Sequence, residues 1–143
     1  MSVLVDTASS AKFVCAGTVP EQLLELWKAQ IGELYVMVLI RWQFQELLRG
    51  RHSVWWVDND VARYCAMKGL SPSKAMRSLF REFYSIDASA PTYSWVERVP
   101  SRSNISDGPS RHCCEEALSL LSLQSETPLK HPDELLKRLL AGL

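Results

Sequence analysis

Long apolar runs are missing from this sequence. The longest, residues 34–40, is far shorter than the roughly 20 residues that a membrane-spanning helix needs. The first residues also lack the basic flank and the apolar stretch of a secretory signal peptide. We therefore expect a soluble protein without a membrane partner.

Cysteine is scarce, and its spacing excludes the usual structural roles. The four cysteines, Cys15, Cys65, Cys113 and Cys114, contain no Cys-x-x-Cys pair, and the three histidines supply no zinc-finger spacing around them. Two of the cysteines are adjacent and cannot easily bridge each other, which argues against a disulfide framework. We expect reduced thiols in an intracellular protein of the cytoplasm or nucleus.

An excess of one charge is missing as well. Lys and Arg number 16 and so do Asp and Glu, so no net field attracts a polyanion. This balance counts against a dedicated nucleic-acid-binding module, although Arg49 with Arg51, or Arg98 with Arg102, leave room for a local basic face.

What the chain does have is a 47% hydrophobic content over 143 residues, enough for the core of one domain.

Turn residues divide the first half of the chain into a hairpin, a long helix and a strand. Residues 2–5 and 12–19 are strand-like segments on either side of a polar turn, which predicts a hairpin. Residues 33–49 continue an apolar helical pattern up to a glycine, which predicts one long helix. Residues 53–57 are apolar at nearly every position, which predicts a strand covered on both faces.

The second half alternates helices and strands again. Gly69 is placed to close one helix and Ser71 to cap the next, while Trp55 and Trp56 are expected in the core and Trp95 on a more open strand. The element order β-β-α-β-α-α-β-α with a tail predicts an α/β fold. The remaining segments predict helices at 61–68, about 71–84, 109–123 and 132–140, a strand at 92–99 and a linker at 124–130.

Three acidic residues stand at unusual positions. Glu33 opens the long helix on a stripe that is otherwise apolar, Asp58 ends the buried strand, and Asp107 lies in a polar loop before a helix. Ligand sites in open α/β sheets gather at the carboxyl ends of strands, where Asp58 must be. Each acid also has an ordinary interpretation, as a first-turn helix residue, a cap and a turn residue respectively.

A shared site for these acids would need a cation. Carboxylates that are brought together repel one another when ionised, unless a positive ion lies between them. Ligation by oxygen alone favours Mg²⁺ or Mn²⁺ over zinc. Two such ions about 4 Å apart activate water and stabilise the leaving oxygen in phosphodiester hydrolysis.

Residues 20–111, about two-thirds of the chain, contain segments that are similar to one known family. They are QIGEL (residues 30–34), LLRGR (47–51) leading into WWVDN (55–59), and RVPSRSNISDGPSR (98–111). On these segments the chain resembles the RNase H-like domain of retroelement reverse transcriptase polyproteins, the last segment being the most specific.

That resemblance implies a mixed sheet flanked by helices, with Glu33, Asp58 and Asp107 as catalytic and metal-binding acids for Mg²⁺ or Mn²⁺. It also implies metal-dependent cleavage of the RNA strand of an RNA–DNA hybrid, and other segments of a retroelement polyprotein as partners. His112, five residues after Asp107, is a further candidate for proton transfer.

One departure from the family concerns a fourth acid on its central first strand. Residues 1–20 hold only one hairpin, and Asp6 falls at its turn, so the two predicted strands match the family's second and third. We therefore expect a partial RNase H-like domain at 1–123, lacking the first strand, followed by a linker and an amphipathic helix at 124–143. A shortened gene model and a decayed retroelement copy both explain this.

Two alternatives to an active nuclease remain. A catalytically inactive remnant would keep the fold and bind nucleic acid or a protein. A helical interaction module would require residues 53–57 and 92–99 not to be strands.

Overall fold

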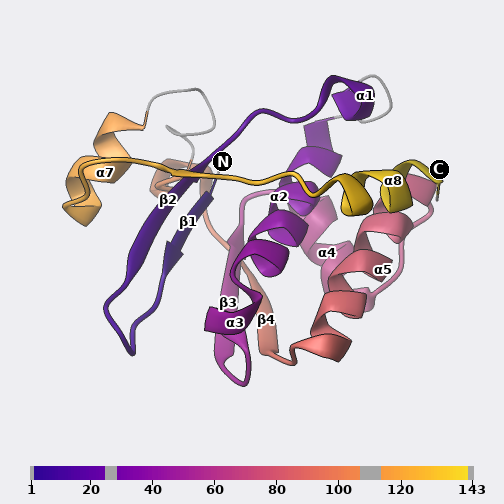
Figure 1. Ribbon diagram of the computed structural model, residues 1–143, viewed down its shortest axis with the longest axis horizontal. Coiled ribbons are helices and arrows are strands. Elements are labelled where there is room, and N and C mark those ends of the chain that lie inside the picture. The colour runs from indigo at the N-terminus through magenta and orange to yellow at the C-terminus, as the bar shows by residue number, and fades with distance from the viewer. Residues whose placement is uncertain (1, 25–28, 107–113, 142–143) are drawn as a thin grey trace. The chain divides into compact units, whose positions relative to one another are not determined.

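The structure, a computed structural model, describes residues 2–24, 29–106 and 114–141 and divides into two compact units. Unit 1 consists of Met1–Thr18 and Pro100–Lys130, and unit 2 of Val19–Val99 and His131–Leu143. Helices and strands alternate along the chain in a mixed α/β arrangement (Figure 1). Unit 1 takes residues from both sides of position 123, where we had placed a boundary.

Unit 1 is built on the N-terminal hairpin. β1 (Ser2–Val5) pairs antiparallel with β2 (Lys12–Ala16), as predicted. Asp6 lies in the turn, where its backbone N–H donates to the Ala11 carbonyl at 2.8 Å and its carboxylate accepts from the Ala8 N–H at 3.1 Å. The prediction of Asp6 as a turn residue is therefore confirmed.

The rest of unit 1 adds the short helix η1 (Ser101–Ser103), the helix α7 (Glu115–Leu121) and the strand β5 (Thr127–Pro128). β5 pairs parallel with β2, so part of the predicted linker at 124–130 is a strand instead. The sequence did not predict β5, because a strand of two residues that pairs with a distant segment has no local pattern of its own. The core of this unit consists of Val14, Cys114 and Ala117, with Val3, Leu118, Leu121 and Leu123 packed against them.

Unit 2 contains the second sheet. β3 (His52–Val57) and β4 (Tyr93–Arg98) pair in parallel, residue for residue, which confirms both predicted strands and is at odds with a purely helical module. The crossover between them carries α4 (Asp60–Lys68) and α5 (Lys74–Ser89), and α5 covers one sheet face. There the Trp55 ring meets Phe83 of α5 edge-on, with ring centroids 5.6 Å apart.

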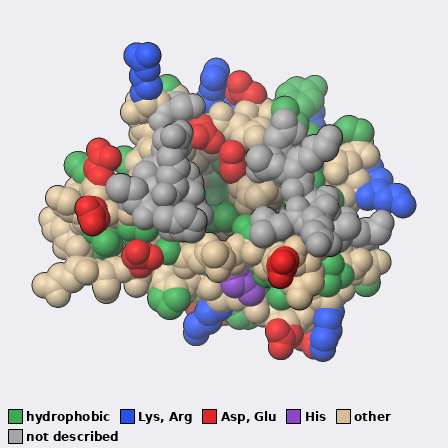
Figure 2. Space-filling view, turned by 90° about the horizontal axis from the view of Figure 1, so that it is seen from above, with side chains coloured by type: hydrophobic (Ala, Val, Ile, Leu, Met, Phe, Trp, Pro, Cys, Tyr) green, Lys and Arg blue, Asp and Glu red, His purple; other side chains and the backbone are tan. Residues whose placement is uncertain are grey.

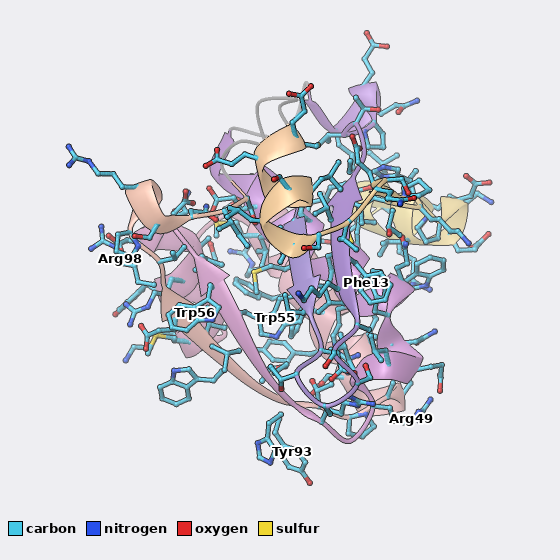
Figure 3. The ribbon with its side chains drawn as sticks, turned by 90° about the vertical axis from the view of Figure 1, so that its left-hand side faces the viewer. Phe13, Arg49, Trp55, Trp56, Tyr93 and Arg98 are labelled. Atoms are coloured by element: carbon cyan, nitrogen blue, oxygen red, sulfur yellow. The ribbon has the colours of Figure 1, made fainter. Side chains whose placement is uncertain are left out.

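The opposite face of β3 departs from the prediction. Val54 and Trp56 are exposed, Trp56 to 62%, although we expected a strand covered on both faces. Figure 3 shows Trp55 and Trp56 on opposite sides of the strand. The reason is the alternation of side chains along a strand: the helices of the crossover cover only the side that carries Trp55. Trp95 of β4 is also exposed, to 61%.

Capping residues set the ends of the crossover helices. Gly69 ends α4 at a left-handed φ of 65°, as predicted. α5, however, is capped by Ser73, whose hydroxyl accepts from the Met76 N–H at 3.4 Å. Ser71, which we expected to be the cap, accepts instead from the Ser73 N–H at 3.2 Å, so Ser71 and Pro72 form the turn before the helix.

The long apolar helix is interrupted near its end. After α1 (Glu21–Leu24), α2 (Ala29–Gln43) and α3 (Gln45–Leu48) replace the single helix predicted over 33–49. The break is at Phe44, whose φ of −109° and ψ of 22° are not helical. α2 packs along α5, and its fully buried Arg41 pairs with Asp87 of α5 at 3.0 Å.

The C-terminal helix belongs to unit 2. α8 (Asp133–Ala141) buries Leu135 and Leu139, and its Arg138 pairs with the buried Glu82 of α5 at 2.9 Å. No helix of the described residues is both long enough and apolar enough to cross a membrane. On the face drawn in Figure 2, Lys and Arg side chains stand apart from one another and form no continuous basic patch.

Candidate functional site

Two of the three acids singled out from the sequence meet in unit 2. Glu33 lies on α2, and Asp58 follows the last residue of β3. The chain turns there from β3 into α4, so Asp58 stands at the carboxyl end of a parallel strand, as predicted. The side chains of Glu33 and Asp58 are hydrogen-bonded to each other, although they are separated by 25 positions in the sequence.

Asn59 holds this junction in place. Its side-chain oxygen accepts from the backbone N–H groups of Val61 and Ala62, at 2.9 and 3.0 Å, and so caps α4. Its side chain and its backbone also form hydrogen bonds with Glu33. The polar residues 58–60 are typical of a helix cap and predicted no further role for Asn59. The available signal for more was its position directly after Asp58.

The two carboxyl groups do not ionise freely together. Burial, followed by the negative charge of Asp58 and the hydrogen bond to it, raises the pKa of Glu33 from 4.5 to about 7. The hydrogen bonds from Asn59 act in the opposite direction, because they favour the carboxylate form. The pair therefore retains a proton close to neutral pH, and a cation between the two groups would replace that proton.

One oxygen of this pair has no donor among the residues that the structure describes. Glu33 Oε2 is buried and lacks a hydrogen-bond partner within the described ranges. A buried oxygen that is left without a donor is unfavourable, typically by about 1–3 kcal/mol. A hard cation satisfies such an oxygen, and two carboxyl groups are the oxygen donors that Mg²⁺ and Mn²⁺ prefer. The residues present therefore fit a divalent ion.

The third predicted acid falls outside the part of the chain that the structure describes. Asp107 and its neighbour in the prediction, His112, both belong to residues 107–113. Within residues 2–24, 29–106 and 114–141, no group of three or more His, Cys, Asp or Glu side chains is arranged to hold a metal ion. The structure thus brings two of the three acids together and leaves the third unplaced.

The pair has a distinct chemical character compared with the other acids of unit 2. Asp87 and Glu97 lie beside Arg41 and Arg63, and the pKa of each carboxyl is lowered. Glu33 instead faces another acid, and its pKa is raised. An acidic pair that is held together at the end of a strand is a candidate functional site on electrostatic grounds.

Comparison of the chain with protein-family models, with curated proteins and with solved structures finds no match.

Proposed function

We propose that this chain is an RNase H-type hydrolase domain of a retroelement reverse transcriptase, acting on the RNA strand of an RNA–DNA hybrid. The observation that carries the proposal is the contact between Glu33 and Asp58, two acids that the sequence assigned to one site. In this proposal the fold is an RNase H-like sheet without its first central strand. The hybrid is recognised through its backbone and shape rather than its sequence.

The acids have defined roles in this proposal. Glu33, Asp58 and Asp107 would hold Mg²⁺ or Mn²⁺, and the ion would supply activation of water and charge stabilisation at the phosphodiester. Asn59 is a positioning residue, because its capping of α4 fixes the backbone next to Asp58 while its hydrogen bonds orient Glu33. Trp55, packed against Phe83, anchors the strand that carries Asp58.

A cleavage assay tests this function. The wild-type chain is incubated with an RNA–DNA hybrid in Mg²⁺ or Mn²⁺ and compared with Asp58→Asn and with Asp60→Asn. Asp60 is two residues away, and its carboxylate pairs with Arg98 at 3.5 Å. We expect cleavage by the wild type and by Asp60→Asn, and a loss of roughly 100-fold or more in Asp58→Asn. Equal rates for all three proteins would refute the proposal.

A second candidate is an inactive remnant of the same fold that binds nucleic acid or a protein. It is favoured by the location of Asp6, whose carboxylate accepts hydrogen bonds within the hairpin turn rather than standing on a strand. The remnant would bind Mn²⁺ weakly or not at all and would not cleave the hybrid under any of these conditions. Turnover that Asp58→Asn abolishes would exclude it.

A further inference from the structure

The outer face of the β3–β4 sheet is exposed and rich in aromatic rings. Because the strands are paired residue for residue, the side chains of every second residue pair lie on this face, and we call each such pair a rank. Trp56, Trp95 and Tyr93 are each more than 60% exposed, at 62%, 61% and 66%. The three ranks are His52 with Tyr93, Val54 with Trp95, and Trp56 with Glu97.

Two of these three rings, Tyr93 and Trp95, are held in place by neighbouring side chains. Tyr93 stacks on His52 with centroids 4.9 Å apart and planes inclined by 24°. The Trp95 indole N–H donates to the Glu97 carboxylate at 3.4 Å. Ordered rings lose little conformational freedom on binding, so the face is prepared to stack against a flat ligand.

The acidic charge beside this face is neutralised by ion pairs. Its acid, Glu97, is paired with Arg63 of α4 at 3.1 Å, and Asp60 is paired with Arg98 at 3.5 Å. The two acids of β3, β4 and α4 are therefore each paired with an arginine. Arg98 is more than half exposed, but its register with Val57 assigns it to the opposite side of the sheet.

The spacing of the ranks also matches stacked bases. Every second residue of a strand is displaced by roughly 6.7 Å. That distance is about twice the 3.4 Å rise of stacked bases, so one base fits between successive ranks. Base–aromatic stacking of this kind is tolerant of sequence and requires the bases to be unpaired.

We propose that this face, formed by Val54, Trp56, Tyr93 and Trp95, binds an unpaired nucleic-acid strand by stacking its bases on the rings. The face leads to the end of β3, where Asp58 follows Trp56 by two residues. Binding here needs neither a metal ion nor hydrolysis and does not depend on the proposed nuclease activity.

A binding measurement without metal tests this proposal. Labelled oligothymidylate and oligouridylate of about 12 nucleotides are titrated with the full chain in EDTA, and fluorescence anisotropy is recorded. We expect Trp56→Ala and Trp95→Ala each to weaken binding about tenfold, whereas Trp56→Phe and Trp95→Phe, which keep a ring, bind nearly as the wild type does. Tyr64→Ala, which removes an equally exposed ring on α4, should leave binding unchanged.

Three results would overturn this proposal. The first is equal binding of the oligonucleotides by the Ala variants and the wild type. The second is equal binding of a duplex of the same length. The third is that the wild type sediments as a dimer while the Ala variants sediment as monomers. The last would show that the face joins two copies. Asp58→Asn separates the two proposals, because it should lose cleavage while keeping oligonucleotide binding in EDTA.

Discussion

The carboxyl group of Glu33 is hydrogen-bonded to that of Asp58, at the junction where β3 gives way to α4. Such a bond requires a proton on one of the two acids. Burial and the neighbouring charge raise the pKa of Glu33 to about 7, so the pair holds that proton into the neutral range. Two ionised carboxylates at this distance would repel each other, and a cation bound between them would remove that repulsion.

The first prediction concerns the metal-free stability of this pair. The pKa of Glu33 is higher in the fold than its ordinary value of 4.5, so the protonated form stabilises the fold. That contribution is complete below about pH 4.5 and is lost as the pH rises through about 7. Glu33→Gln mimics the protonated group and should raise the unfolding temperature in EDTA by a few degrees near pH 8 and hardly at all near pH 5.

Calorimetry at the two pH values checks this first prediction. Glu46→Gln is the control, because Glu46 is an exposed acid paired with Arg49 at 2.9 Å. The control should show the same pH dependence as the wild type. A Glu33→Gln variant that melts at the same temperature as the wild type at both pH values would contradict the repulsion between the two acids.

The second prediction separates the two roles of Asn59. Asn59→Ala removes the cap of α4 and should cost about 1 kcal/mol in the free energy of unfolding. Because its bonds to Glu33 favour the carboxylate, the variant should also raise the pKa of Glu33 further. Ser73→Ala removes the cap of α5 at a similar cost and should leave that pKa unchanged. NMR titration of the Glu33 carboxyl carbon measures this pKa in both variants. If the pKa of Glu33 is the same in Asn59→Ala and Ser73→Ala, Asn59 acts only as a helix cap.

The third prediction concerns the fully buried Arg41. Its guanidinium pairs with Asp87 at 3.0 Å and also donates to the Ala90 carbonyl, joining α2 to the end of α5. Arg41→Met leaves Asp87 without its cation and should lower the free energy of unfolding by roughly 2–4 kcal/mol. Urea denaturation measures the loss. Arg49→Met, at an exposed pair, should leave the midpoint unchanged, and equal midpoints for both variants would be inconsistent with a structural role for Arg41.

The fourth prediction concerns the attachment of α8. The Tyr35 hydroxyl and His131 Nδ1 are hydrogen-bonded at 2.8 Å, and burial lowers the pKa of His131 below 6.5. The neutral ring is therefore the stabilising form, and its contribution is lost as the pH falls from 6.5 through the lower value in the fold. Tyr35→Phe should cost about 1 kcal/mol at neutral pH. Proteolysis near α8 should be faster in Tyr35→Phe than in the wild type. Equal cleavage rates in the two proteins would argue against a stabilising contact between Tyr35 and His131.

Much of the fold could be predicted from local signals. The glycine after residues 61–68 predicted the end of α4, because Gly69 adopts a left-handed φ at no steric cost. The turn around Asp6 and the alternation of β1 and β2 predicted the hairpin, since both are properties of neighbouring residues. These features depend on a few adjacent side chains.

Features set by distant contacts could not be predicted in the same way. The apolar string at 53–57 gives no indication of which faces the other elements leave open, so Trp56 was placed in the core and is exposed. The pairing of β5 with β2 joins segments more than 100 residues apart. At the site, the strand pattern correctly placed Asp58 at the end of β3, whereas Glu33, which was expected to open the helix, lies more than one turn inside α2. The additional hydrogen bonds of Asn59 depend on tertiary packing, and its position directly after Asp58 was the only sign of them in the sequence.

We propose that Glu33 and Asp58 share a divalent ion, and direct Mn²⁺ binding is the most direct test of this site. Mn²⁺ is titrated into the wild type, Glu33→Gln, Asp58→Asn and Asp60→Asn, and the free ion is followed by electron paramagnetic resonance. We predict binding by the wild type and Asp60→Asn, with affinity reduced at least tenfold in the other two. Binding that is the same in all four proteins, or absent from the wild type, would contradict a metal site at the end of β3.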